Sequence, residues 1–290
     1  MGRGIMETSA WPDSEACWFL SQEVFRSLKQ ISDTIEECIE LFPSLLQDPH
    51  EAQARQERFV MQQAANQSSN DTAKCVLVLQ GNLIVQAELQ IKIQKHPNTI
   101  HKTSINQDKP WVLTQIQDSG NFLAEARRKV REAAQLRQRL AADDAKTEPD
   151  VQLLRFIAAR LGVIMDELMM VLKRGRDCLL SPRKKTIEDH LNSENMKALN
   201  PALPGDTAVS FYVQGHRLML AVYHLVSQQG NMRFDSFLAE CTVSKLNSIL
   251  ICYTRAFQMC QQIKNKLFWA TKCNEVKNFR YAGFGQNSVW

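Results

Sequence analysis

The side chains that usually carry out chemistry occur in this sequence, but their spacing matches no known catalytic or metal-binding motif. The six histidines are His50, His96, His101, His190, His216 and His224. None has the spacing of a zinc-binding helix, and none has cysteine neighbours at ligand spacing. Gly81, Gly162 and Gly175 stand alone, no Gly-Lys-Ser follows a strand, and Gly283-Phe284-Gly285 has no strand before it, so no phosphate-binding loop is predicted. We therefore expect neither a cofactor nor a bound metal.

The cysteines are typical of structural thiols rather than nucleophiles. Eight cysteines are spread over the chain without a Cys-x-x-Cys pair, which is the usage expected of a reduced protein. Cys17, Cys38, Cys178 and Cys260 take apolar positions of predicted helices, and no basic group is placed to lower the pKa of a thiol there. We expect no catalytic residue and a protein that is not an enzyme. An enzyme without any linear motif is the alternative, and a polar pocket with shifted titratable groups would support it.

The elements that must position these residues are long amphipathic helices, and the stretch Asp150–Ser181 is the clearest. Two rows of apolar residues recur there at every seventh position: Leu154, Leu161 and Leu168, then Ile157, Ile164 and Val171. This pattern predicts a helix whose narrow apolar seam packs against other helices. Gly175 also falls on the seam, so we expect a neighbouring helix to approach closely at that residue.

Three further stretches have the same kind of seam and are predicted to be helices. They are Glu15–Phe42, Asp108–Leu140 and Ser236–Thr271. Four seams of this length would close one antiparallel bundle within the chain. The residues of the predicted seams are Val24, Leu28, Ile31, Ile35, Ile116, Leu123, Val130, Leu154, Ile157, Leu161, Ile164, Leu168, Val171, Leu246, Ile249, Tyr253, Cys260, Ile263 and Leu267.

Two stretches between the helices change to strict alternation, which is typical of half-buried strands. In the first, residues 85–93 alternate between apolar and polar, and Gly81-Asn82 predicts a tight turn before them. In the second, residues 209–213 alternate, and Gln214-Gly215 could turn the chain into residues 218–222. Because residues 218–225 also fit a helical period, both interpretations of that segment stay open.

These elements predict an elongated α+β protein with an antiparallel, leucine-zipper-like four-helix bundle and a small antiparallel β-sheet domain. Both domains would be discontinuous in sequence. The α domain would take residues 14–46, 108–181 and 236–273, and the β domain residues 57–106 and 183–228. Residues 1–13 and 274–290 are predicted to be flexible tails.

Composition and charge narrow the classes of partner. Of the 290 residues, 44% are hydrophobic and 23% are charged, which is usual for a folded soluble protein. The net charge of +4 is too weak to predict a nucleic-acid partner. No apolar run approaches the roughly 20 residues that cross a bilayer, and the N-terminal residues lack the apolar core of a signal peptide. We expect a cytoplasmic protein that reaches membranes only through partners.

The predicted helices differ in charge. The first is acidic and the third is basic, so opposite charges favour them as neighbours, although two independent solvated faces explain the pattern equally well. Arg127, Arg128 and Arg131 form the candidate partner surface on the basic helix. This surface could meet an acidic protein or lipid headgroups.

Four short stretches follow one another in a characteristic order through most of the chain. They are Leu77–Asn82, Trp111 with Gln115–Asp118, Asn200–Asp206 and Cys260–Lys266. In this order they resemble the Rogdi family, leucine-zipper proteins of the RAVE/rabconnectin complex. The resemblance implies a curved protein with two parts, a four-helix α domain and a β domain from the central segments. It brings no catalytic residues.

The resemblance also implies a role, since the family is similar to assembly factors of the vacuolar proton pump. We therefore expect a non-enzymatic adaptor that binds a rabconnectin/RAVE-type scaffold and, through it, the V-ATPase. Such an adaptor would promote V-ATPase assembly and organelle acidification, including that of synaptic vesicles in neurons. It would be cytoplasmic and partly recruited to vesicle and endomembrane surfaces, with the nuclear envelope as a further location. We expect a monomer outside the complex; the alternative is a homodimeric coiled-coil protein with other partners.

Overall fold

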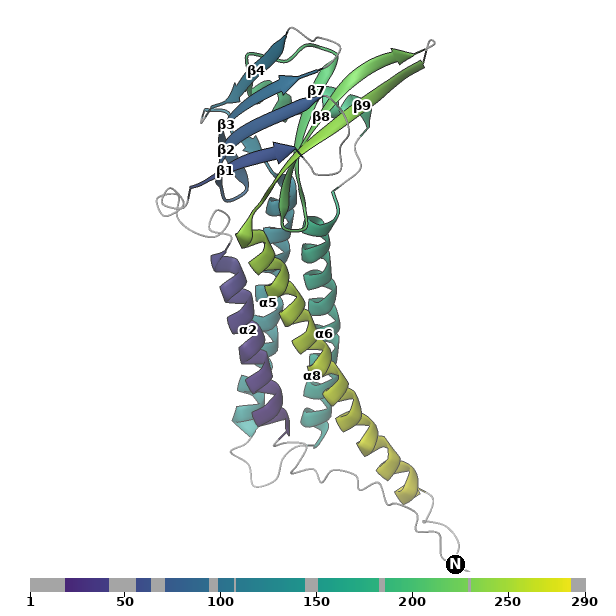
Figure 1. Ribbon diagram of the computed structural model, residues 1–290. Coiled ribbons are helices and arrows are strands. Elements are labelled where there is room, and N and C mark those ends of the chain that lie inside the picture. Colours follow the sequence, from purple (N-terminus) through teal and green to yellow (C-terminus); the bar gives the residue numbers. More distant parts are fainter. Residues whose placement is uncertain are drawn as a thin grey trace, which may run out of the picture. The chain divides into compact units, whose positions relative to one another are not determined.

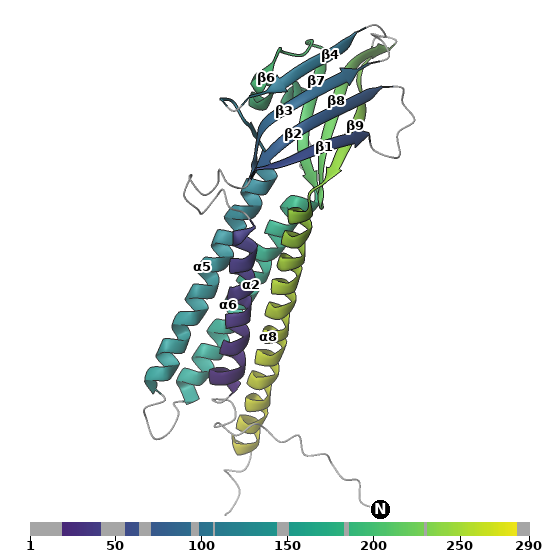
Figure 2. The same ribbon diagram turned by 60° about the vertical axis from the view of Figure 1, so that its left-hand side comes forward.

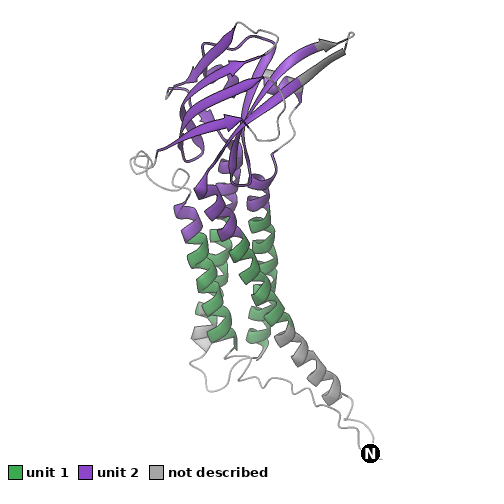
Figure 3. Ribbon diagram, viewed as in Figure 1, with its two compact units in different colours: residues 1–36, 124–173, 254–290 green, residues 37–123, 174–253 purple. Residues whose placement is uncertain are grey.

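The computed structural model describes residues 19–41, 56–63, 71–93, 99–106, 108–143, 151–182, 186–228 and 231–282. The chain divides into two compact units, shown in different colours in Figure 3. Unit 1 consists of residues 1–36, 124–173 and 254–290, and unit 2 of residues 37–123 and 174–253. Of the predicted tails, residues 1–13 and 283–290 lie outside the described residues, whereas residues 274–282 belong to the helix α8 (Ser244–Ala282) and are not a tail.

Segments of four helices make up the described part of unit 1. A short π-helix, η1 (Phe19–Val24), continues into α2 (Phe25–Glu40). The other three are α5 (Thr114–Asp143), α6 (Val151–Leu180) and α8 (Ser244–Ala282). Their unit 1 segments lie side by side in both Figure 1 and Figure 2.

Ion pairs join neighbouring helices of unit 1 around its perimeter. They are Arg127 with Glu36, Lys129 with Glu167, Lys264 with Asp166, and Lys266 with Glu23. In the first of them, the Nε atom of Arg127 on α5 lies 2.8 Å from Oε1 of Glu36 on α2. The expectation that the acidic and the basic helix are neighbours is thereby confirmed.

The apolar positions of the four helices face inward. Every residue named in the predicted seams has a buried side chain, and the most exposed of them, Val171, exposes only 8%. Leu161 and Ile164 near the middle of α6 expose 0%. Removing such side chains from water is the main favourable contribution to folding. The seven-residue spacing on α6 therefore corresponds to a packed row in unit 1.

Unit 2 contains one curled antiparallel sheet of nine strands in the order β6-β4-β3-β2-β1-β9-β8-β7, with β5 beside β3 (Figure 2). The strands are β1 (Glu57–Gln63), β2 (Thr72–Gln80), β3 (Leu83–Lys92), β4 (Ile100–Ile105), β5 (Trp111–Val112), β6 (Leu199–Asn200), β7 (Thr207–Gln214), β8 (Arg217–Gln228) and β9 (Asn231–Thr242). Between α6 and β6 lie the short helices α7 (Ile187–Leu191) and η3 (Glu194–Ala198).

Two tight turns predicted from the sequence are confirmed. Gly81 turns β2 into β3 with a φ of 60°, and Gly215 turns β7 into β8 with a φ of 66°. Both angles lie in the left-handed region that glycine adopts without steric cost. Because residues 218–225 belong to β8, the strand interpretation of that segment is confirmed and the helical one is wrong.

Contacts within unit 2 join the two β stretches and cover one edge of the sheet. The end of β1 pairs with β9, with Gln62 opposite Glu240. At the edge strand β7, the amide N–H of Val213 donates to Oε1 of Gln115, 2.8 Å away. The Gln115 side-chain amide in turn donates to the carbonyl oxygen of Val213 over 2.9 Å. A covered edge has fewer free backbone groups with which another chain could pair.

The predicted fold class, a four-helix bundle with a small β-sheet domain, is wrong. The described residues form five α-helices and one large curled sheet of nine strands. The ends of the long helices moreover belong to the same unit as the sheet, so the helices are not a domain apart from it.

The sheet was predicted too small because two helices begin later in the chain than expected. The predicted helix from Ser236 begins at Ser244 instead, because residues 231–242 form β9 and pair with β8 along twelve residues. The predicted helix from Asp108 begins at Thr114, after β5.

A candidate protein-binding surface on helices α5 and α6

Two of the thiols in helical positions, those of Cys38 and Cys260, are buried and held protonated, whereas Cys178 is only partly buried. Burial raises the pKa of Cys260 to about 12. A hydrogen bond with Cys252 and burial raise the pKa of Cys38 further, and its Sγ atom lies 3.9 Å from the carbonyl oxygen of Ile249. Since the thiolate is the reactive form, these two residues act as packed side chains. Among the described residues no group of three His, Cys, Asp or Glu side chains could hold a metal ion.

A row of exposed apolar side chains runs along the outer face of α6 in unit 1. Phe156, Val163 and Met170 expose 53%, 46% and 49%. Because seven residues make almost two full helical turns, the three side chains lie on one face of the helix. We call these three residues the α6 row. Their spacing repeats that of the buried seam on the opposite face, so one helix has two apolar rows.

The α6 row is distinctive within its unit. Among the described side chains of unit 1, no large apolar residue of α2 or α5 is exposed, and α8 exposes Phe268 at 50%. Apolar side chains that are exposed and contiguous mark sites of contact with another protein, whereas single ones are common. In the part of the chain described here, no helix is long and apolar enough to span a membrane.

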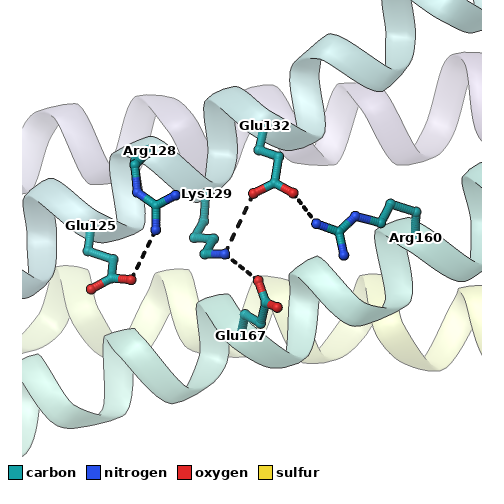
Figure 4. A network of polar contacts seen from close by, with 6 residues as sticks. All are labelled: Glu125, Arg128, Lys129, Glu132, Arg160 and Glu167. Atoms are coloured by element: carbon teal, nitrogen blue, oxygen red, sulfur yellow. Dashed lines mark hydrogen bonds and ion pairs between the residues drawn. The ribbon is translucent and has the colours of Figure 1, made fainter.

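A network of ion pairs borders the α6 row on the side of α5 (Figure 4). Its members are Glu125, Arg128, Lys129 and Glu132 of α5 and Arg160 and Glu167 of α6. Lys129 pairs with Glu167. It also pairs with Glu132, where the Nζ atom of Lys129 lies 3.6 Å from the Oε2 atom of Glu132. Arg160 pairs with Glu132. Arg160 and Glu167 precede and follow Val163 by three and four residues, so they lie along one border of the row.

The charge state of the network depends on Glu132. Its partial burial raises the pKa of the carboxyl group, but the hydrogen bond from Arg160 and the charges of Lys129 and Arg160 outweigh that effect. The pKa of Glu132 therefore lies below its ordinary value of 4.5. At neutral pH the carboxylate is ionised and links α5 to α6.

The other border of the row faces α8, where Asp166 pairs with Lys264. Both borders are thus neutralised by ion pairs within the chain. The ends of the row differ, because Arg155 and Lys173 are exposed and neither makes an ion pair with any residue that the structure describes. The surface has an apolar centre, paired charges at its sides and free positive charge at its ends.

The three arginines that were expected to form a partner surface differ in their ion-pair partners. Arg127 pairs with Glu36 of α2, and a third of its side chain is exposed. Arg128 pairs with Glu125 of the same helix, with 3.2 Å between Nη2 and Oε1. Arg131 is exposed and unpaired within the described residues. Their role in binding stays a prediction.

The α6 row itself was not anticipated from the sequence. The signal was present, because Phe156, Val163 and Met170 recur every seventh residue like the leucines of the inner seam. Periodicity alone cannot say which of two apolar rows on one helix faces the core. The burial of the leucine row makes that assignment, and it leaves the second row as the surface available for contact.

Known proteins resemble this chain over most of its length. The family described as "Rogdi leucine zipper containing protein" matches residues 15–271. Protein rogdi of Drosophila melanogaster is 39% identical over 250 residues, which are 86% of this chain and 85% of that protein. The protein rogdi homologs of Danio rerio and Homo sapiens are 31% and 29% identical and cover 89% and 88% of this chain. The matched residues run from the first described helix into α8, and the chain belongs to the Rogdi family.

Proposed function

We propose that this protein is a non-enzymatic adaptor subunit of a RAVE/rabconnectin-type complex that promotes V-ATPase assembly and organelle acidification. The observation that carries the adaptor role is the α6 row, since an apolar row exposed beside a packed core is typical of a surface that a partner covers. Membership of the Rogdi family supports the choice of this complex as the one that the adaptor joins.

The helical unit is suited to present such a surface. The α6 row lies on a helix whose opposite face is fully buried, with Leu161 and Ile164 exposing 0%. Ion pairs tie the same helix to α5 and to α8. A surface held on both sides in this way loses little conformational entropy when a partner binds. In this proposal the protein is cytoplasmic and is recruited to vesicle and endomembrane surfaces by its scaffold.

We further propose a monomer outside the complex. A homodimeric coiled coil would need an exposed leucine seam, but Leu154, Leu161 and Leu168 expose at most 5%. Pairing two copies through that seam would require unit 1 to open. Solution mass by light scattering distinguishes the two states.

The test is co-purification of the full chain from cells that lack the endogenous protein. Restoring the chain should recover a rabconnectin-type scaffold, increase the membrane-bound share of the pump's catalytic sector and lower organelle pH. Cells with an empty vector are the control. If no scaffold co-purifies and neither pump assembly nor organelle pH changes, the proposed function is rejected.

A further inference from the structure

We infer that the α6 row binds an acidic amphipathic helix of a partner protein. The inference rests on the proposed function only in that a protein partner exists. The row spans the fifteen residues from Phe156 to Met170, and the fourteen steps between its ends measure about 21 Å at 1.5 Å per residue. A straight helix of about four turns covers that length, and an apolar residue at every seventh position would meet each side chain of the row.

The surface beside the row allows a close approach. Ala159 is exposed, and Gly162 has open space around the position where a Cβ atom would lie, with no atom within 4 Å. Both residues lie between Phe156 and Val163 in sequence and border the row. Two large side chains separated by small ones form a hole that accepts an apolar side chain of another helix.

Charge decides which helix fits. At the sides of the row, Arg160, Glu167 and Asp166 are already paired within the chain. At the ends, Arg155 precedes Phe156 directly and Lys173 follows Met170 by three residues, and both are exposed without an ion pair among the described residues. A partner with acidic residues near both of its ends would complement this pattern, and complementary charge raises the association rate and fixes orientation.

The same charges disfavour two other occupants. In an antiparallel pair of copies centred on Val163, Arg155 of one copy lies near Lys173 of the other, and in a parallel pair each cation meets its own counterpart. Like charges in contact oppose binding. An anionic membrane would be attracted only by these two cations, because the charges along both borders are already paired within the chain, so its headgroups gain little there.

The first experiment uses the full chain and a designed peptide. The peptide is a labelled helix of about 18 residues with leucine at every seventh position and glutamates near both ends; a control peptide has lysines in their place. Fluorescence anisotropy at low salt should show at least tenfold tighter binding of the acidic peptide. Equal affinity for the two peptides, or tighter binding of the basic one, overturns the inference.

Matched variants locate the site. Val163→Glu in the row should weaken binding of the acidic peptide at least tenfold, whereas Val60→Glu should leave it unchanged, because Val60 exposes 61% on β1 of unit 2. Lys173→Glu should weaken binding of the acidic peptide and strengthen binding of the basic peptide. This variant lies outside the α6 row, so its effect does not come from placing a charge within the apolar contact. Circular dichroism confirms folding of each variant. An unchanged affinity in both Val163→Glu and Lys173→Glu contradicts the assignment.

Other occupants have their own readouts. A dimer in solution that Val163→Glu dissociates, or binding to phosphatidylserine vesicles that Val163→Glu abolishes, would replace the acidic helix as occupant and overturn the inference. The same variant is tested in cells. If the scaffold co-purifies equally with the wild type and with Val163→Glu, the inference is refuted, but the proposed function is supported. If the acidic peptide binds at the α6 row but no scaffold co-purifies, the inference is supported and the proposed function is rejected.

Discussion

The ring and hydroxyl group of Tyr253 on α8 fill the space that a side chain on residue Gly175 of α6 would occupy. A Cβ atom at Gly175 would lie 2.7 Å from each of the ring atoms Cε1 and Cζ of Tyr253. The Tyr253 hydroxyl donates to the carbonyl oxygen of Ser119 on α5, 2.7 Å away. The Ser119 hydroxyl donates to the carbonyl oxygen of Gly175 over 3.0 Å. Three helices therefore meet at one buried point in unit 2, and the close approach predicted at Gly175 is confirmed.

We expect Gly175→Ala to destabilise the protein by about 1–3 kcal/mol, because an added methyl group cannot fit against a buried ring. Gly162→Ala on the same helix is the matched control, since it meets no atom within 4 Å. Alanine is the better helix former by about 1 kcal/mol, so the control should be neutral or stabilising. Urea unfolding of both variants measures the difference. If Gly175→Ala is as stable as Gly162→Ala, the close approach is refuted.

The hydroxyl group of Tyr253 should itself contribute to stability. Burial raises the pKa of Tyr253 well above its ordinary value despite the opposing hydrogen bond with Ser119, so the group stays a neutral donor. Tyr253→Phe should cost about 0.5–1.5 kcal/mol, the usual net contribution of such a hydrogen bond. Tyr212→Phe is the control, because the Tyr212 side chain is only partly buried and its hydroxyl group makes no hydrogen bond with a described residue. Equal losses in both variants would mean that the bond to Ser119 contributes nothing.

Local periodicity was sufficient to locate the seams and the two hairpins. Leu154 and Leu161 lie seven residues apart and are both buried, since this spacing keeps side chains on one helical face. Gly81 and Gly215 mark turns because few other residues adopt a positive φ. Each of these signals depends only on residues close together in sequence.

The extent of the sheet and the binding surface depend on contacts distant in sequence. Residues 236–242 have apolar side chains compatible with a helix, but pairing with β8 places them in β9. That competition is decided by cross-strand partners, and no local propensity reports it. The exposure of Phe156 likewise follows from which face of α6 meets α5 and α8, and the sequence of α6 alone does not contain that information.

Truncating the side chain to alanine should have very different effects on stability at two nearby positions of α6. Leu161 exposes 0% and Val163 exposes 46%. Leu161→Ala should therefore cost about 2–5 kcal/mol through lost burial and a cavity. Val163→Ala should change the free energy of unfolding by less than about 0.5 kcal/mol. Comparable losses in the two variants would show that the faces of α6 are assigned incorrectly.

The thiol of Cys260 should be unreactive in the folded protein. It exposes 0%, and burial raises its pKa to about 12, so the thiolate is scarce at pH 8. Mass spectrometry after treatment with iodoacetamide should find Cys260 unmodified in the native protein and modified in urea. Cys241, partly exposed with a pKa raised to about 11 by burial and the nearby Glu240, is the comparison. Native labelling of Cys260 as fast as that of Cys241 would disprove its burial.

The last prediction concerns the dependence of stability on pH through Glu132. Because its pKa in the folded protein lies below the ordinary 4.5, the ionised carboxylate stabilises the fold above that pH. This contribution is lost as the pH falls below 4.5 and through the lower pKa of the folded state. Glu132→Gln should therefore cost about 1 kcal/mol at pH 7, and the difference from the wild type should shrink at pH 3.

Glu125→Gln is the matched control, since it removes one carboxylate from the same helix and breaks only the exposed pair with Arg128. It should change the free energy of unfolding by less than about 0.5 kcal/mol. Thermal unfolding of the three proteins at pH 3, 5 and 7 measures these differences. A wild-type advantage over Glu132→Gln that persists undiminished at pH 3 would show that the ionised carboxylate is not its source. The bond between α5 and α6 would then depend on the packing of residue 132 rather than on its charge, and the paired border of the α6 row would have to be reconsidered.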